Sequence, residues 1–281
     1  MTDFSNTPKP ARTTLKKRIY RWLKVGLLLY GIIGIGLYYL QEKMLFQPEV
    51  DDRTLPYHFD AKFEELDVPV NATDTMHLVK FFPTDTVRKG VVVYFHGNKQ
   101  NIQRYAKFAK WFTQKGYEVW MEDYPGYGKS VGERNENILK QQGLQVYRMA
   151  QTRYHADSII IYGKSLGTGI AAYVAANTTQ QQLMLETPYP SIPDLFSSYA
   201  PIYPTERMSH YKLPIKNYLK DVSSPVTIFH GTSDRVIFYR CAKQLKEVLK
   251  KNDRFVTIEG GTHHNLGEFP LFQKVLDSLL R

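Results

Sequence analysis

The sequence has a single cysteine, Cys241, among its 281 residues. One thiol cannot form an intrachain disulfide, so the fold must form without one, and the redox state of its compartment cannot be inferred. No internal repeat or low-complexity stretch is present, which excludes repeat architectures. No cluster of cysteine, histidine and carboxylate residues has the spacing of metal ligands. We therefore expect no metal site.

Two segments end like a phosphate-binding P-loop but lack its first glycine. They are Gly163-Lys164-Ser165 and Gly128-Lys129-Ser130. A P-loop needs a glycine five positions before the second glycine of the motif. Ser158 and Asp123 occupy those positions, so nucleotide binding is disfavoured.

Acidic residues are scarce at the N-terminus. Residues 1–24 carry seven lysines and arginines against Asp3 alone, whereas the whole chain has 37 basic and 27 acidic residues and a net charge of +10. The rest of the chain is therefore only mildly basic. The basic cluster adjoins an apolar segment and accompanies no nucleic-acid-binding fold, so it indicates a membrane flank rather than DNA or RNA binding.

The apolar segment Val25–Leu40 contains no charged residue. As a helix it would span about 24 Å, near the short limit for a bilayer core of about 30 Å, and Trp22, Tyr38 and Tyr39 are suitable interfacial anchors. A cleaved signal peptide is the alternative, but the residues that follow lack a small-residue cleavage site. We predict one transmembrane helix with a cytoplasmic N-terminus. The rest of the chain then lies across the membrane, in the periplasm if the source is bacterial.

Beyond this segment, strand-like runs alternate with helical stretches. Strands are expected at 63–69, 76–82, 91–95, 117–122, 158–162, 182–186, 225–229 and 254–258. Helices are expected near 101–115, 135–153, 166–177, 237–251 and 268–280. This alternation predicts an α/β fold with a mostly parallel central sheet and helices on both faces. The first two runs form a hairpin that extends the sheet with antiparallel pairing.

A Gly-x-Ser-x-Gly motif, Gly163-Lys164-Ser165-Leu166-Gly167, follows the run 158–162 and precedes an alanine-rich helical stretch. Between a strand and a helix this motif is the pattern of a nucleophile elbow. The glycines are needed because the serine occupies a sharp, strained turn. Ser165 is therefore the predicted nucleophile. The alternative is a glycine-rich turn that binds nothing.

A nucleophilic serine needs a histidine base and an acid that orients the histidine. Asp234 lies in the loop directly after the run 225–229, where α/β sheets place catalytic groups. The adjacent His263 and His264 follow the run 254–258. Asp234 is the predicted acid, and Glu186, after the strand-like residues 183–185, is the alternative.

From about Phe63 to the C-terminus, the chain resembles the α/β-hydrolase superfamily, in particular its membrane-anchored branch of lysophospholipid lipases, acylglycerol lipases and protein depalmitoylases. The segments that carry the resemblance are Tyr94–Asn98, Asp123–Ser130, Tyr162–Gly167, His230–Asp234 and Gly260–His263. Their order, with Ser before Asp before His, is the order of this superfamily. The resemblance implies the α/β-hydrolase fold and a Ser-His-Asp triad, but no particular substrate.

The adjacent histidines leave a choice of base. Relatives in this branch commonly have Gly-x-x-His at this place, often followed by asparagine. Alignment on Gly260 favours His263, whereas alignment on Asn265 favours His264. We predict His263 as the base and His264 as a solvated loop residue.

The resemblance also implies an oxyanion hole made of two backbone N–H groups. One belongs to Leu166, directly after the nucleophile, and the other to Asn98, by likeness to the family's His-Gly-x pattern. His96 and His230, each followed by a glycine, are expected to shape their loops rather than act as bases.

A proline-rich excursion, 188–221, interrupts the alternation, and in this fold such an excursion commonly caps the active site. Its Phe196, Tyr199 and Tyr203 are predicted to line a substrate pocket; the alternative is that they pack the cap onto the core. The predicted organisation is a basic cytoplasmic tail (1–24), a transmembrane anchor (25–40), a linker (41–60) and an α/β-hydrolase catalytic domain (61–281).

Together these features predict a membrane-anchored serine hydrolase that cleaves carboxylic esters of lipid or amphiphilic acyl substrates. The lipid preference follows from an anchor that holds the site near the bilayer. An acyl-protein thioester is the second substrate class, and a non-catalytic interaction protein with a hydrolase fold is the alternative from another class. No cofactor and no nucleic-acid partner is expected. The sequence does not define the acyl chain length, the head group or the oligomeric state.

Overall fold

The computed structural model of the protein describes residues 15–84 and 88–281. The chain divides into two compact units, with the boundary between Glu42 and Lys43. Asp3, Lys9 and Arg12 of the predicted basic tail lie outside the described residues.

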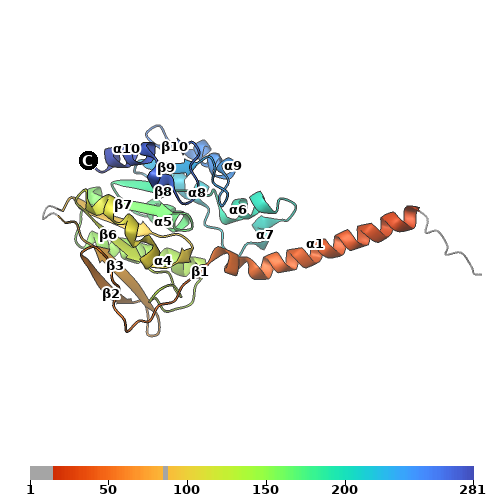
Figure 1. Ribbon diagram of the computed structural model, residues 1–281, viewed down its shortest axis with the longest axis horizontal. Helices are drawn as coiled ribbons and strands as arrows, with labels where there is room; N and C mark the ends of the chain where they lie inside the picture. Colours follow the sequence, from red (N-terminus) through yellow and green to blue (C-terminus); the bar gives the residue numbers. More distant parts are fainter. Residues whose placement is uncertain (1–14, 85–87) are drawn as a thin grey trace, which may run out of the picture. The chain divides into compact units, whose positions relative to one another are not determined.

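The described part of the first unit is helical. Its helix α1 (Leu15–Leu45; Figure 1) contains the expected span Val25–Leu40 but begins ten residues earlier and ends five residues later. At 1.5 Å per residue, its 31 residues are about 46 Å long. The most apolar 18-residue window has a mean hydropathy of 1.7 and none of it is buried. By length and composition α1 is therefore consistent with a single-pass membrane anchor, although a signal sequence near an N-terminus shares these properties.

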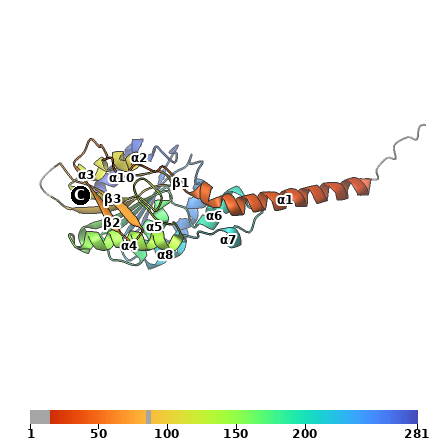
Figure 2. The ribbon, with the colours of Figure 1, turned by 90° about the horizontal axis from the view of Figure 1, so that it is seen from below.

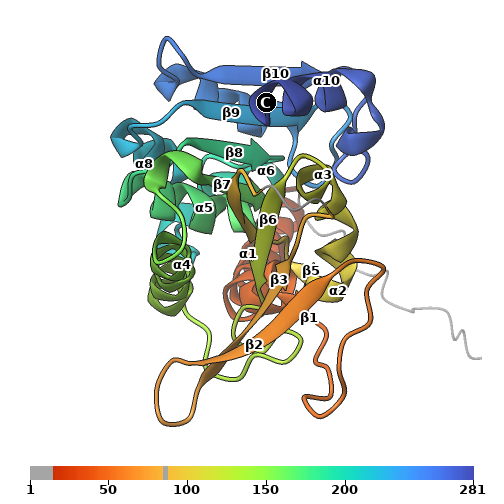
Figure 3. The same cartoon turned by 90° about the vertical axis from the view of Figure 1, so that its left-hand side faces the viewer.

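The second unit is built on an eight-stranded sheet in the order β10-β9-β8-β7-β4-β6-β3-β2 (Figures 1 and 3). The strands are β2 (Phe63–Pro69), β3 (Thr75–Phe81), β4 (Gly90–Phe95), β6 (Tyr117–Glu122), β7 (Ile159–Lys164), β8 (Gln182–Glu186), β9 (Val226–Gly231) and β10 (Arg254–Ile258). The strands β4 and β6 to β10 run parallel, whereas β3 pairs with β6 and β2 with β3 in antiparallel fashion. The predicted fold class is confirmed.

Helices cover both faces of this sheet (Figures 2 and 3). One face carries α4 (Glu136–Gln151), α5 (Gly167–Ala176) and α8 (Ile215–Asp221), and the other carries α2 (Ile102–Tyr105), α3 (Lys110–Thr113) and α10 (Pro270–Leu279). Successive strand side chains point to opposite faces. In β4, Val91 and Val93 therefore join the apolar cluster under α4 and α5, while Val92 and Tyr94 join the cluster under α3 and α10.

Two helices expected as continuous are divided into short pieces. The stretch 101–115 forms α2, the 3₁₀ turn η1 (Ala106–Phe108) and α3, and the stretch 237–251 forms α9 (Tyr239–Ala242) and the 3₁₀ helix η3 (Lys243–Val248). Another 3₁₀ turn, η2 (Ala156–Ser158), precedes β7, and η4 (Leu266–Glu268) precedes α10. The excursion 188–221 contains α6 (Ile192–Tyr199), α7 (Thr205–Met208) and α8.

The residues after α1 are part of the second unit, whereas a linker was expected over 41–60. Strand β1 (Gln47–Pro48) pairs in parallel with β5 (Lys99–Gln100), and Val50 forms a β-bridge with Gly128. Tyr57 is only 4% exposed and belongs to the apolar core. Buried aromatic and backbone contacts thus tie this segment to the fold, although its composition is polar.

Candidate active site

Ser165 occupies the turn between β7 and α5 with a φ of 51°. Left-handed backbone is unfavourable for a residue with a Cβ, so it marks a constrained turn. The flanking glycines fit this turn because they have no side chain. A Cβ on Gly167 would lie 2.1 Å from the carbonyl oxygen of Phe95, and a Cβ on Gly163 would lie 2.7 Å from the carbonyl oxygen of Gly167. The Gly-x-Ser-x-Gly motif therefore forms the strand–turn–helix geometry that it predicts.

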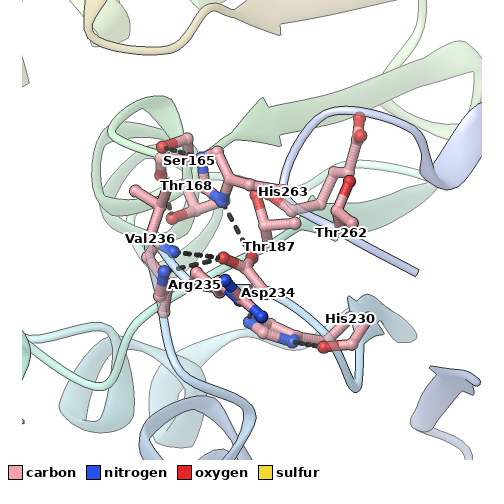
Figure 4. A network of polar contacts seen from close by, with 12 residues as sticks. Ser165, Thr168, Thr187, His230, Asp234, Arg235, Val236, Thr262 and His263 are labelled. Atoms are coloured by element: carbon pink, nitrogen blue, oxygen red, sulfur yellow. Dashed lines mark hydrogen bonds and ion pairs between the residues drawn. The ribbon is translucent and has the colours of Figure 1, made fainter. Parts of the chain in front are cut away.

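Ser165, Asp234 and His263 come together from the loops that follow β7, β9 and β10 (Figure 4). Nε2 of His263 lies 2.9 Å from Oγ of Ser165, and its Nδ1 lies 2.8 Å from Oδ2 of Asp234. All three residues are buried. A neutral imidazole that donates Nδ1–H to the carboxylate leaves Nε2 free to accept the serine proton. The arrangement can therefore activate the hydroxyl of Ser165.

Asp234 is held in place by contacts to both of its carboxylate oxygens. Its Oδ1 accepts the backbone N–H groups of Val236 and Ile237, each at 2.8 Å, while Oδ2 faces His263. Burial acts to raise the pKa of Asp234. The hydrogen bond and charge of His263, with the Ile237 N–H, outweigh burial and hold that pKa below its usual value. The carboxylate is therefore ionised at neutral pH, as the stabilisation of an imidazolium requires.

The structure places His263, and not His264, against Ser165. The two rings lie edge to face with centroids 5.0 Å apart, so they point in different directions. Partial burial of the ring, followed by the neighbouring charges of His263, Lys164, Arg104 and Lys99, lowers the pKa of His264 to about 4. His264 is exposed but lines the same cavity as Ser165, so it is not the purely solvated residue that we expected.

The two N–H groups expected to form an oxyanion hole flank Ser165. Among the described residues, neither Leu166 nor Asn98 donates its backbone N–H to a protein acceptor, so both groups are available. The loop that carries Asn98 lies against the nucleophile, because a Cβ on Gly97 would be 3.5 Å from the Cβ of Ser165. The carbonyl oxygen of Asn98 accepts the N–H of Gln47 at 3.0 Å and the hydroxyl of Tyr127 at 2.8 Å.

Ser165 and His263 open onto a cavity of about 50 Å³. Its other lining residues are Asn98, Lys99, Arg104, Tyr105, Lys107, Phe108, Lys164 and His264. One water molecule needs only about 10–15 Å³ of such space, so the cavity has room for a few water molecules beside Ser165.

Comparisons with known proteins agree with this fold. A family described as "Serine aminopeptidase, S33" matches residues 86–207. An α/β hydrolase from Penicillium, GrgF, aligns with a TM-score of 0.61 at 13% identity, over 78% of this chain and 98% of its own. An esterase of Pyrococcus furiosus aligns with a TM-score of 0.64 at 14% identity, over 84% of this chain and 98% of its own.

The family match and the relatives together support the α/β-hydrolase superfamily. Human protein ABHD12B is 26% identical to it over 205 residues, which are 63% of this chain and 56% of the human protein. The chain therefore spans little more than half of the length of that relative. The superfamily inferred from the sequence motifs is confirmed, with support for an ABHD-like branch, and the matches support a hydrolase.

Other histidines and carboxylates of this α/β-hydrolase make their hydrogen bonds outside the triad, and Nε2 of His230 lies 3.7 Å from Oδ2 of Asp234. The carboxylate of Glu186, the alternative acid, accepts hydrogen bonds from the ammonium of Lys164 and from the hydroxyl of Tyr162. The second of these is 2.5 Å long. His96 and His230 are buried, and their Nδ1 atoms lie 2.7 and 3.0 Å from the carbonyl oxygens of the glycines that follow them. These contacts fit a role of both histidines in shaping their loops.

The three aromatic residues expected in a substrate pocket do not line this cavity. Phe196 packs against the apolar cluster on the α5 face. Tyr199 is 54% exposed and donates its hydroxyl to the carbonyl oxygens of Arg235 and Val236 at 3.0 and 2.5 Å. Tyr203 is 8% exposed, within the excursion. As folded, the excursion thus fits the alternative of a packed cap, and a role of these side chains in substrate binding remains a prediction.

The described residues offer few other reactive groups. Over 15–84 and 88–281, no three histidine, cysteine or carboxylate side chains are grouped in a way that could hold a metal ion. Cys241 is buried, and burial raises the pKa of its thiol to about 12, so this thiol is a poor nucleophile at neutral pH.

The four cations that line the cavity were missed from the sequence. A signal was present: Arg104 and Lys107 are three residues apart just after the His-Gly-Asn segment, and Lys164 lies inside the Gly-x-Ser-x-Gly motif. No role was predicted for the Lys164 side chain in either motif that contains it.

Proposed function

We propose that this α/β-hydrolase is a membrane-anchored serine hydrolase that cleaves carboxylic esters of lipid or amphiphilic acyl substrates. The observation that carries the proposal is the continuous contact from Asp234 through His263 to Ser165, with distances of 2.8 and 2.9 Å. The likeness to the Pyrococcus furiosus esterase adds support for ester chemistry.

In the first half of the reaction, Oγ of Ser165 attacks the carbonyl carbon of the substrate while Nε2 of His263 takes its proton. The carboxylate of Asp234 stabilises the resulting imidazolium. The N–H groups of Asn98 and Leu166 hold the oxyanion, and one such donor is worth about 10²–10³ in kcat. His263 then gives its proton to the leaving oxygen, and an acyl-enzyme remains on Ser165.

In the second half, water attacks the acyl carbonyl and gives its proton to His263. The tetrahedral intermediate collapses, Ser165 takes the proton back from Nε2, and the carboxylic acid departs. Both halves use the same two N–H groups. The chemistry needs no cofactor.

An acyl-protein thioester is the second substrate class, because the same nucleophile and oxyanion hole would cleave it. A non-catalytic interaction protein is disfavoured, since the acid, base and nucleophile are all present in reactive geometry. Acyl esters and thioesters of matched chain length, compared by kcat/KM, separate the first two classes.

We place the N-terminus in the cytoplasm and the catalytic unit on the far side of the membrane, in the periplasm if the source is bacterial. The support is the basic residues before α1 and the apolar, unburied window within it. Intact mass of the protein from the membrane fraction tests the anchor. The full chain of 32.6 kDa is expected, whereas a product that has lost the α1 segment would indicate a cleaved signal.

The proposed mechanism is tested by labelling the full chain in neutral detergent with a fluorophosphonate probe, which reacts with activated serines. Wild type and His264→Ala are expected to be labelled, while Ser165→Ala and His263→Ala are not. Thermal unfolding of each variant checks that it is folded. A folded wild type that resists the probe would overturn the proposal in favour of an interaction protein, and labelling of Ser165→Ala would refute the assigned nucleophile.

A further inference from the structure

Three exposed cations surround the cavity beside Ser165: Lys99 in β5, Arg104 in α2 and Lys107 in η1. We call them the cationic wall. The lining of the cavity contains no aspartate or glutamate. The site therefore has a strongly positive side directly next to the nucleophile, although the chain beyond its N-terminal tail is only mildly basic.

The charges of the cationic wall are not neutralised by the protein. In the part of the chain that the structure describes, no carboxylate lies within ion-pair distance of any of the three. Arg104 instead donates to the side-chain oxygen of Gln100 at 2.5 Å, a neutral acceptor. The fourth lining cation, Lys164, differs because it is buried and paired with Glu186.

These charges act within the cavity. The low pKa of His264, about 4, has burial as its largest cause, followed by the charges of His263, Lys164, Arg104 and Lys99. Two members of the cationic wall therefore disfavour a positive charge at a residue that lines the cavity. By the same interaction they favour a negative charge there.

The leaving group of the substrate is the part that faces this wall. His263 must give its proton to the leaving oxygen, so that oxygen lies on the His263 side of Ser165, and His263 lines the cavity. The acyl chain is disfavoured in the same space, because a hydrocarbon among unpaired cations would cost desolvation of the charges.

We propose that the cationic wall is a binding subsite for an anionic group on the alcohol part of the substrate, so that the hydrolase prefers acyl esters of phosphorylated alcohols. The inference rests on the proposed function and adds the chemistry of the leaving group. A phosphate suits the wall because it offers several acceptor oxygens to guanidinium and ammonium donors from three different elements.

The test compares 1-butanoylglycerol 3-phosphate with 1-butanoylglycerol. Both substrates are water-soluble, carry the same acyl group and differ only in the phosphate, so attraction to an anionic membrane surface plays no part. The measured quantity is the ratio of kcat/KM for the phosphate ester to that for the neutral ester. The enzyme is the full chain in neutral detergent, at low and at high salt.

Wild type is expected to favour the phosphate ester, and salt is expected to weaken this preference because the wall is exposed. Arg104→Gln and Lys107→Gln should each lower the ratio by about two- to fivefold, the size expected for an exposed charge pair, and the double variant by more. The matched control is Lys110→Gln, which removes an exposed lysine of α3 outside the cavity and should keep the wild-type ratio.

A wild-type ratio of one or less would overturn the subsite, and so would a double variant with the same ratio as Lys110→Gln. A preference seen only with long-chain esters in micelles would assign the cations to a membrane surface instead and also refute the proposal. The fluorophosphonate probe releases only fluoride and has no phosphorylated alcohol part to contact the wall, so it reports Ser165 independently. Labelled protein without phosphate preference therefore disproves the subsite alone, whereas unlabelled protein disproves the proposed function.

Discussion

Replacing Gln47 by proline should impair catalysis from outside the active site. The backbone N–H of Gln47 donates to the carbonyl oxygen of Asn98 at 3.0 Å, and proline has no such N–H. Gln47 lies in the short strand β1 and its preceding residue, Phe46, is already outside α1, so the substitution does not break that helix. The change removes one of two contacts that fix the peptide after Asn98, whose own N–H is proposed to bind the oxyanion.

The expected magnitude follows from the contacts that remain. A backbone hydrogen bond contributes about 1 kcal/mol net, which corresponds to about a fivefold change in the ratio of aligned to misaligned loop. The hydroxyl of Tyr127 still holds the carbonyl oxygen of Asn98 at 2.8 Å. We therefore expect Gln47→Pro to lower kcat by at most about fivefold. With Tyr127→Phe added, the loss should approach the value for a missing oxyanion donor, about 10²–10³.

The assay is steady-state hydrolysis of a soluble acyl ester by the full chain in neutral detergent, with thermal unfolding measured in parallel. Glu49→Pro is the matched control. It also removes a backbone N–H beside β1, but that N–H donates to the carbonyl oxygen of Gln100 at 3.3 Å and not to Asn98. Equal values of kcat for the two variants would refute the reasoning. A loss of kcat that tracks a loss of thermal stability in both would do the same.

Two further outcomes are expected. Asp234→Asn should keep the hydrogen bonds from the backbone N–H groups of Val236 and Ile237 to Oδ1. It should still lower kcat about 10³–10⁴-fold, because the amide favours the wrong tautomer of His263. Steady-state kinetics measures kcat, and a loss under tenfold would contradict this prediction. Glu122 is buried, its oxygens have no hydrogen-bond partner among the described residues, and burial followed by the charge of Asp123 holds its pKa well above the usual 4.5. The folded state then keeps a proton that the unfolded state releases above that pH, so the stability of wild type falls as pH rises. Relative to wild type, Glu122→Gln should accordingly gain unfolding free energy by about 1.4 kcal/mol per pH unit as the pH rises above about 5, until the pKa of Glu122 in the folded state is reached. Chemical denaturation in neutral detergent measures the difference, and a difference independent of pH would exclude this carboxyl as the cause.

The strands of this fold could be predicted from the sequence because each is a short apolar run between turn residues. The run expected at 91–95 is observed as Gly90–Phe95, and that expected at 182–186 is observed unchanged. The helical stretch 101–115 was less predictable, since it contains no internal glycine or proline to mark where it divides. The division of this stretch into short pieces accompanies aromatic contacts with distant parts of the chain. One example is Trp111, whose ring centroid lies 5.2 Å from that of Phe272.

The nucleophile, acid and base could be proposed from the sequence because each follows a recognisable strand. Local motifs fix such positions, since the carboxyl ends of parallel strands meet at one edge of the sheet. The choice between His263 and His264 could not be made from spacing alone. It depends on which ring points at Ser165, and that direction is set by the loop conformation.

The role of the segment after α1 illustrates what sequence reasoning lacks. Residues 41–60 are polar and were therefore expected to form a linker, but composition reports solvation and not the hydrogen bonds that a backbone can make. Gln47 contacts Asn98 through main-chain atoms, which any residue except proline would supply. No pattern of side chains could have signalled that contact.

The same reasoning applies to the cationic wall. Net charge averages over the whole unit, whereas an ionised group responds to charges within a few ångströms. Lys99, Arg104 and Lys107 are ordinary surface cations in the sequence, and they become a subsite only where the fold brings them to Ser165 and His264, which are more than fifty residues further along the chain. A mildly basic hydrolase can therefore present a strongly basic site, and the phosphate preference measures that local field directly.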